Sequence, residues 1–158
     1  TILRCMNPFL ISIDGRSGSG KTVLAEQLAA KLQAPVLHLD EFGDDYHPFI
    51  GLPALYQEVA KSDVPLLIIE GVGVIDTRLS AYRHFSIMLQ TSDDERARRI
   101  IERDSHKFDS DEMTAVGNLW DEAEKEHFGS EFHADLTLDS TTPIDVDALS
   151  EIISRETR

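Results

Sequence analysis

The sequence contains little cysteine and no long apolar run. Cys5 is the one cysteine in 158 residues, which excludes a disulfide within the chain and fits a reducing compartment. Its default role is that of a small apolar side chain. No apolar run approaches the length of a transmembrane helix, and the first residues lack the charged, apolar and small-residue sections of a signal peptide. We therefore expect a cytoplasmic protein that does not bind membranes.

Basic residues are also scarce. The chain has 15 lysines and arginines against 29 aspartates and glutamates, a formal net charge of -14. Such a surface repels nucleic acid and anionic membranes, so the predicted partner is a small molecule. The length suits a single domain spanning 1–158, and we see no repeat, low-complexity segment or linker. Composition leaves the oligomeric state open between monomer and homodimer.

Short apolar runs alternate with helical patterns along the chain. Expected strands cover 9–13, 35–39, 65–69, 84–89 and 134–138, and expected helices cover 21–32, 53–60, 77–82, 92–103 and 111–128. A closing helix is expected to start at Thr142 and Pro143. Because each strand is apolar throughout, the pattern predicts an α/β fold in which helices cover both faces of a five-stranded parallel sheet.

A glycine-rich stretch, IDGRSGSGKT, follows the first apolar run. It satisfies G-x-x-x-x-G-K-[ST], the phosphate-binding P-loop pattern. Its glycines permit positive φ, so that successive N–H groups point into one concavity that suits an anion. The lysine adds a mobile charge, the following helix turns its positive end to the same point, and the threonine can offer a hydroxyl to Mg²⁺. Candidate nucleotide-binding residues are Gly15, Arg16, Ser17, Gly18, Ser19, Gly20, Lys21 and Thr22.

The alternative for this stretch is a glycine-rich turn that binds nothing. The sequence context disfavours it, because a buried strand is expected before the turn and an apolar helical stripe after it. That stripe comprises Leu24, Ala25, Leu28, Ala29 and Leu32. We therefore predict that the stretch binds the phosphates of a nucleotide.

Two carboxylates, Asp40 and Glu70, follow the second and third apolar runs. The carboxyl ends of parallel strands share one edge of the sheet, where ligands bind. Phosphoryl transfer needs a magnesium ion and a group that orients or deprotonates the attacking oxygen. We hypothesise that Asp40 takes the acceptor's proton and helps hold the water shell of the metal, while Glu70 orients metal-bound water or the acceptor. The alternatives are a turn or helix cap for Asp40 and a solvated strand end for Glu70.

An arginine cluster lies in the segment TSDDERARRIIERD. Arg96, Arg99 and Arg103 follow i, i+3, i+7 spacing and share one helix face, whereas Arg98 lies off that row. We predict a lid at about 92–110 whose guanidinium groups close over the triphosphate, with Arg96 binding nucleotide and Arg99 and Arg103 catalytic. The alternative is a solvated helix face whose arginines pair with nearby acids. A capping box at Ser92 opens this helix.

Other aromatic and imidazole side chains carry less information. Five in the segment 42–56 either stack on a substrate or cover the sheet: Phe42, Tyr46, His47, Phe49 and Tyr56. The helix at 111–128 has an apolar side of Met113, Val116, Leu119, Trp120 and Ala123, and core packing is the stronger interpretation for Trp120. The six histidines lack an i, i+4 pair and a cysteine partner, which favours structural or surface roles over zinc binding.

Taken together, IDGRSGSGKT, HLDEF, IIEG and ERARRIIERD resemble the uridine kinase-like group of P-loop kinases, which includes nucleoside kinases and phosphoribulokinase. The resemblance implies a three-layer P-loop NTPase fold with a helical lid, Asp40 as catalytic base, Glu70 as the carboxylate after the third strand, and Arg96, Arg99 and Arg103 as lid arginines. WDEAEKEHF, at 120–128, also looks like a stretch of small bacterial members, without an assigned chemistry. Only 41–64 are available where uridine kinases build a nucleoside-gripping hairpin, so nucleoside specificity does not follow.

The sequence thus favours a kinase that uses ATP and Mg²⁺ to phosphorylate a hydroxyl or phosphate of a small metabolite, with Lys21, Asp40, Glu70, Arg99 and Arg103 as catalytic residues. Thr22, Asp40 and Glu70 are the candidate metal site. The competing function is a regulatory ATPase or switch that has no small-molecule acceptor. Guanine-type switches use an N-K-x-D element, which the sequence lacks.

Overall fold

The computed structural model describes residues 7–129 and 133–157, so Cys5 lies outside the described residues. Within these ranges five parallel strands form one sheet in the order β2-β3-β1-β4-β5. The strands are β1 (Phe9–Gly15), β2 (Val36–His38), β3 (Leu66–Glu70), β4 (His84–Gln90) and β5 (Leu136–Asp139). The predicted five-stranded parallel sheet is confirmed, and each expected strand is present within two residues of its expected start.

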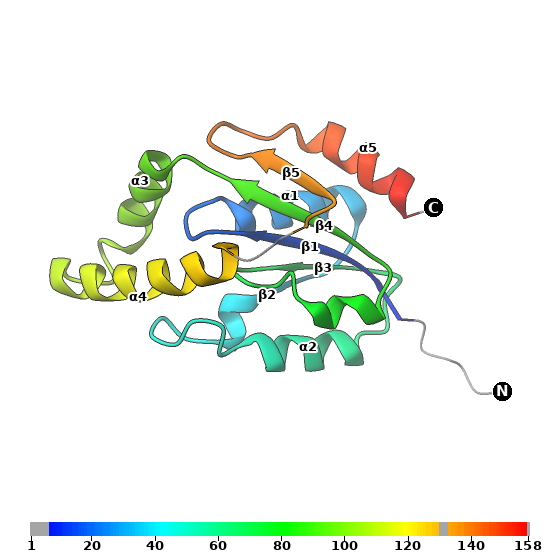
Figure 1. The fold of residues 1–158 in the computed structure, drawn as a ribbon. Helices are drawn as coiled ribbons and strands as arrows, with labels where there is room; N and C mark the ends of the chain where they lie inside the picture. Colours follow the sequence, from blue (N-terminus) through cyan, green and yellow to red (C-terminus); the bar gives the residue numbers. More distant parts are fainter. Residues whose placement is uncertain (1–6, 130–132, 158) are drawn as a thin grey trace.

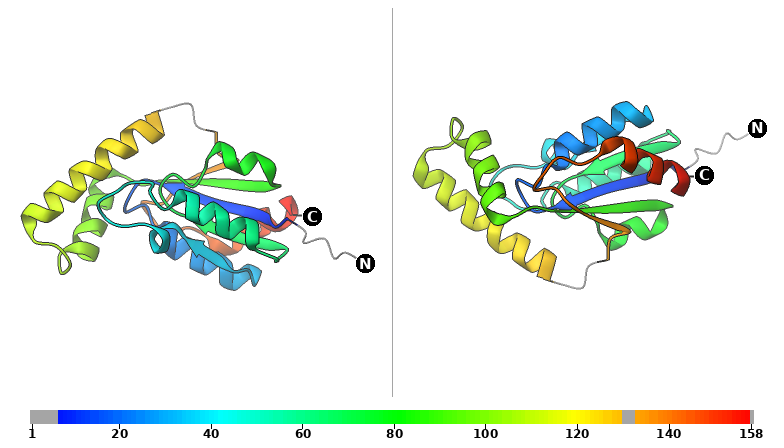
Figure 2. Two further views of the ribbon diagram at one scale, coloured as in Figure 1. Left: turned by 90° about the horizontal axis from the view of Figure 1, so that it is seen from below. Right: turned by 90° about the horizontal axis from the view of Figure 1, so that it is seen from above.

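Helices cover both faces of the sheet. Figures 1 and 2 show α1 (Lys21–Leu32) and α5 (Val146–Glu156) on one face, and α2 (Leu52–Lys61) on the other with the 3-10 helices η1 (Leu39–Phe42) and η2 (Thr77–Ala81). The remaining helices, α3 (Asp93–Asp104) and α4 (Ser110–Gly129), lie beyond the carboxyl ends of the strands. This is the edge at which open parallel sheets bind ligands.

The two faces of β1 supply two separate parts of the core. Ile11 and Ile13 pack in a cluster with residues of α1 and α5, such as Leu28 and Ile153. Leu10 faces the opposite way and packs in a second cluster that includes Leu55 of α2. All six side chains are fully buried. The central strand is thereby fixed from both sides, and it carries the glycine-rich loop at its end.

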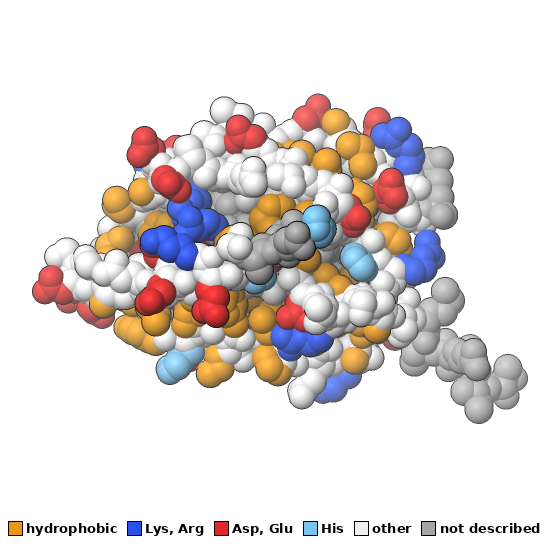
Figure 3. All heavy atoms as spheres, in the orientation of Figure 1, with side chains coloured by type: hydrophobic (Ala, Val, Ile, Leu, Met, Phe, Trp, Pro, Cys, Tyr) orange, Lys and Arg blue, Asp and Glu red, His pale blue; other side chains and the backbone are white. Residues whose placement is uncertain are grey.

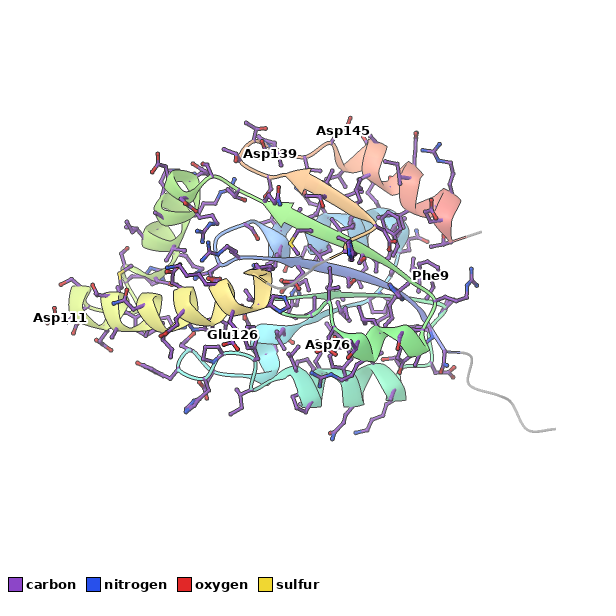
Figure 4. The ribbon with its side chains drawn as sticks, in the orientation of Figure 1. Phe9, Asp76, Asp111, Glu126, Asp139 and Asp145 are labelled. Atoms are coloured by element: carbon purple, nitrogen blue, oxygen red, sulfur yellow. The ribbon has the colours of Figure 1, made fainter. Side chains whose placement is uncertain are left out.

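Side-chain caps fix two of the helix starts. Ser92 Oγ accepts a hydrogen bond from the Glu95 amide at 3.3 Å, as the capping box predicts. The predicted start of the closing helix at Thr142 and Pro143 is wrong. Helix α5 begins at Val146, because Asp145, labelled in Figure 4, caps it by accepting from the Ala148 amide at 3.0 Å.

Helix α4 does not pack on the sheet. Of its side chains that the structure describes, Glu124 alone is buried, and Leu119 of the expected apolar side is 39% exposed. The helix lies beyond the strand ends (Figure 1), which places its apolar side away from the two core clusters. Although α4 has 20 residues, neither it nor another helix in 7–129 and 133–157 has the length and apolar character needed to cross a membrane.

Candidate active site

The glycine-rich loop joins β1 to α1 in the backbone geometry that the sequence predicts. Gly15, Gly18 and Gly20 have φ angles of +156°, +80° and +88°. At Gly18 a Cβ atom would come within 2.8 Å of the Arg96 carbonyl oxygen. Glycine is therefore needed here both for the conformation and for the close approach of α3.

Lys21 folds back over this loop. Its ammonium donates to the Arg16 carbonyl oxygen at 2.9 Å and to Ser19 Oγ at 3.3 Å. The side chain is 9% exposed, and burial lowers the pKa of the ammonium while the carboxylates of Glu70 and Asp14 act to raise it. Burial is the largest of these influences, so the pKa of Lys21 lies below its ordinary value.

Thr22 and Glu70 meet at the start of α1. Thr22 Oγ1 donates to Glu70 Oε1 at 3.2 Å, and His38 Nδ1 lies 2.9 Å from the same oxygen. Glu70 is 2% exposed, and burial raises the pKa of its carboxyl, opposed by the hydrogen bond from His38. Two of the three candidate metal-site residues, Thr22 and Glu70, are therefore in contact. The solvated strand end considered for Glu70 is wrong, because the side chain is buried. His38 is an additional partner that the sequence does not single out.

One cleft of about 790 Å³ collects most of the predicted residues. Asp40, in η1, lines it with an exposed side chain, and its charge acts on Lys21, Glu70 and Arg103. The lining predicted from sequence comprises Ser17, Gly18, Gly20, Lys21, Thr22, Asp40, Glu70, Arg96, Arg99 and Arg103. In the described ranges no group of three or more His, Cys, Asp or Glu side chains is placed to hold a metal by itself.

The α3 arginines divide between the loop and the surface. Arg96 donates to the Ser17 carbonyl oxygen and Arg99 to that of Gly18, each at 3.2 Å, so that α3 is fixed to the glycine-rich loop. Arg103 lines the cleft and pairs with Asp104 at 2.8 Å. Arg98, off the row, forms the solvated pairs with Glu95 and Glu102 that the alternative interpretation describes. Figure 3 shows basic side chains gathered at this end with acidic ones around them.

Some aromatic residues of the 42–56 segment cover the sheet, and others are free to contact a ligand in the cleft. Phe42 and Tyr56 pack against the second core cluster, whereas Tyr46 is 52% exposed. Phe49 belongs to both groups, because it packs against that cluster and also lines the cleft. Its φ of +67° is unusual for a bulky side chain and turns the chain at the cleft wall.

Asp14, at the end of β1, is completely buried and holds two loops together. One carboxylate oxygen accepts from the amides of Gly15 at 2.7 Å and Gly73 at 2.9 Å, and the other accepts from the Ile75 amide at 3.2 Å. His127 Nε2 lies 3.1 Å from the second oxygen. Asp14 therefore fixes the start of the glycine-rich loop against the segment after β3.

Replacing Asp14 with alanine should lower the free energy of unfolding by about 3 kcal/mol, because the substitution leaves buried backbone N–H groups without acceptors. Urea denaturation measures this loss. Asp63→Ala, an exposed site between α2 and β3, is the control and should shift stability by about 0.5 kcal/mol or less. Equal stabilities for Asp14→Ala and the unmodified protein would show that these hydrogen bonds contribute nothing.

One face of α4 lines the cleft, a role that the sequence did not indicate. Trp120 Nε1 donates to the Asp45 carbonyl oxygen at 2.7 Å, and the ring meets Phe49 edge-on, so core packing is the wrong interpretation for Trp120. Asp121 pairs with Arg16 at 2.8 Å. Glu124, 2% exposed, accepts from the Ser17 amide. The segment WDEAEKEHF thus places two of its polar side chains, Asp121 and Glu124, on the glycine-rich loop.

The fold is shared with solved small-molecule kinases. APS kinase from Mycobacterium tuberculosis, in a structure with AMPPNP and APS, matches with a TM-score of 0.66 and 16% identity over 95% of this chain and 97% of that one. This is the P-loop kinase fold. Shikimate kinase from Bacteroides thetaiotaomicron matches with a TM-score of 0.59 and 19% identity over 92% of this chain and 98% of that one. Gluconokinase from Sinorhizobium meliloti matches with a TM-score of 0.58 and 15% identity over 96% of this chain and 99% of that one. No family model and no curated protein matches the sequence.

Proposed function

We propose that this protein is an ATP-dependent kinase that moves the γ-phosphoryl group to a hydroxyl or phosphate of a small metabolite. The observation that carries the proposal is the single cleft onto which the glycine-rich loop, Lys21, the Thr22–Glu70 pair and Asp40 all face. The kinase fold of the structural neighbours supports it. The motifs quoted above support a place in the uridine kinase-like group.

The loop and the start of α1 fit the phosphates of a nucleotide. Three positive-φ glycines orient successive amides, and α1 begins directly after Gly20 with Lys21 at its first position. Backbone N–H groups and the helix dipole there suit an anion, and the lysine can turn from the Arg16 carbonyl oxygen toward the terminal phosphates. Thr22 and Glu70 would hold a magnesium ion together with phosphate oxygens, and the ion would neutralise charge on the phosphates.

Asp40 is the proposed base. The oxygen of an acceptor hydroxyl attacks the γ-phosphorus, the bond to the β-phosphate oxygen breaks, the hydroxyl proton passes to the Asp40 carboxylate, and ADP leaves. Asp40 suits this role because its side chain is exposed in the cleft while Glu70 is buried beside Thr22. Arg99 and Arg103 on α3 would place positive charge over the transferred group.

ADP release measured against a panel of nucleosides, nucleoside monophosphates and sugar alcohols tests the proposal. The expected result is release that depends on one class of acceptor and is lost in Lys21→Ala. ADP release that no acceptor stimulates would instead support the regulatory ATPase. Absence of ADP release with the whole panel, and of ATP binding, would contradict both functions.

The buried Glu70 carboxyl predicts opposite effects of pH on activity and stability. Because burial raises the pKa of Glu70 above 4.5 and the ionised form is needed at the metal, turnover should fall as the pH drops toward that raised pKa. A carboxyl whose pKa is raised by folding stabilises the protein below the unfolded pKa, and this stabilisation is lost as the pH rises through the folded pKa. Relative to the unmodified protein, Glu70→Gln should therefore be less active yet gain stability between pH 4 and pH 7.

Turnover and urea denaturation at both pH values check this prediction. Glu26→Gln serves as the control, because this glutamate of α1 has a side chain that is 62% exposed. A stability difference between Glu70→Gln and the unmodified protein that does not grow with pH would show that burial is not the dominant influence on this carboxyl.

A further inference from the structure

Helix α4 contacts the glycine-rich loop through consecutive loop residues. Asp121 pairs with Arg16, and one turn later Glu124 accepts a hydrogen bond from the Ser17 amide. Trp120 lies on the same face, four residues before Glu124, and reaches the Asp45 carbonyl oxygen. Spacings of three and four residues place these side chains side by side on a helix. The Trp120–Glu124 face therefore connects the phosphate loop to the opposite wall of the cleft.

The peptide unit between Arg16 and Ser17 is held from both sides by charged groups. Its carbonyl oxygen accepts from the Lys21 ammonium at 2.9 Å, and its N–H group donates to the carboxylate of Glu124. The N–H group points away from the ammonium, but Ser17, Lys21 and Glu124 all line the same cleft. The N–H groups of a P-loop surround phosphates and its lysine reaches the β- and γ-phosphates, so we infer that the Ser17 N–H group lies at the terminal-phosphate end of the loop. A carboxylate of the protein therefore occupies an amide that suits a phosphate oxygen.

A second position is available to this carboxylate. Arg16 Nε is buried and has no hydrogen-bond partner among the described residues, and it lies 3.9 Å from Glu124 Oε2. A small shift of Glu124 away from the Ser17 amide would bring it into hydrogen-bond range of this guanidinium. The exchange keeps a buried carboxylate next to a positive charge, which limits its cost.

We propose that Glu124 makes the site respond to the terminal phosphate, and so distinguishes a nucleoside triphosphate from a diphosphate. One N–H group cannot donate a full hydrogen bond to two anions at once. A γ-phosphate at the Ser17 amide therefore displaces Glu124 toward Arg16 and shifts α4. A diphosphate ends before this position and leaves Glu124 in place. The inference rests on the proposed function, because it assumes that the loop binds nucleotide phosphates.

The chain carries its own reporter of this shift. Trp120 is the one tryptophan in the sequence and lies on the α4 face that bears Glu124. Its fluorescence should therefore change when α4 moves against Asp45 and Phe49. The unmodified protein is titrated with Mg²⁺ and β,γ-imido-ATP, and separately with Mg²⁺ and ADP. We expect the triphosphate analogue to change the tryptophan emission at saturation and ADP to change it less than half as much.

Calorimetry of two variants gives the second measurement. Glu124→Gln removes the competing charge, so the ratio of β,γ-imido-ATP to ADP affinity should rise about tenfold over that of the unmodified protein, in line with a hydrogen bond to a charged group. Glu126→Gln makes the same chemical change at an exposed position of α4, labelled in Figure 4, and should leave the ratio unchanged.

Two results would overturn the inference: equal emission changes with the analogue and with ADP, or an unchanged affinity ratio in a folded Glu124→Gln variant. The fluorescence titration uses the unmodified protein, so it decides the question even where the variant fails to fold. Failure of the proposed function would give a different outcome. Neither nucleotide would then bind, and Lys21→Ala would change neither nucleotide binding nor ADP release.

Discussion

Replacing Lys21 with methionine should reduce phosphoryl transfer by roughly 10²- to 10³-fold, the range measured when one preorganised donor to developing charge is removed. The Lys21 ammonium folds back over the loop and lies 2.9 Å from the Arg16 carbonyl oxygen. Methionine keeps the buried alkyl stem and removes only the ammonium, so the loss reports charge rather than packing. Affinity for ATP should fall as well, because the lysine reaches the terminal phosphates.

Steady-state turnover and calorimetric titration with ATP and Mg²⁺ measure the two effects. Lys31→Met is the matched control on the same helix, because its side chain is 52% exposed and pairs with Asp147 on α5. It should leave turnover within twofold of the unmodified protein, in keeping with the small contribution of surface pairs. A Lys21→Met variant that binds and turns over ATP normally would remove the glycine-rich loop from the catalytic site.

Asp40→Asn should lower turnover with the true acceptor by about 10²- to 10⁴-fold, the usual contribution of a positioned general base. The asparagine is nearly isosteric but cannot take the acceptor's proton. Because Asp40 lies in η1 rather than in the glycine-rich loop, the KM for ATP should change little. A fall in kcat with a nearly constant KM for ATP is thus the expected pattern.

Glu41→Gln is the control for Asp40→Asn. It changes the neighbouring acid, which is exposed and does not line the cleft. Its turnover should equal that of the unmodified protein. Undiminished turnover in Asp40→Asn would assign the proton to another group and leave Asp40 as a turn residue.

The fold and the loop were predictable because their signals are local. Each strand is a continuous apolar run, and a strand buried on both faces produces that pattern wherever it occurs. The geometry at Gly15, Gly18 and Gly20 follows from a motif in which each glycine has its own backbone requirement. Asp40 and Glu70 could be placed because parallel strands bring their carboxyl ends to one edge.

The role of α4 could not be predicted in the same way. An apolar stripe on a helix looks the same in sequence whether it faces the sheet or the wall of a cleft, and Trp120 lines a cleft. Glu124 and His127 acquire their roles only through contacts with Ser17 and Asp14, more than 100 positions away. Such long-range partners leave no periodic signal in a single sequence.

The start of α5 shows two local signals in competition. Thr142 and Pro143 fit the first positions of a helix, and so does Asp145. The segment before Asp145 makes hydrogen bonds that a helix would break. Arg99 donates to the carbonyl oxygen of Ser140 at 2.7 Å, and Asp139 accepts from the Thr141 amide. These contacts fix residues 139–141 outside a helix, and the helix starts at the later cap, Asp145.

Calorimetric titration of the unmodified protein with ATP in the presence of Mg²⁺ shows directly whether the glycine-rich loop binds a nucleoside triphosphate. We expect saturable binding of one ATP per chain with a dissociation constant below about 1 mM, because loop amides, an ammonium and a helix N-terminus converge on one point. No detectable binding at millimolar ATP, from protein shown to be folded, would contradict it.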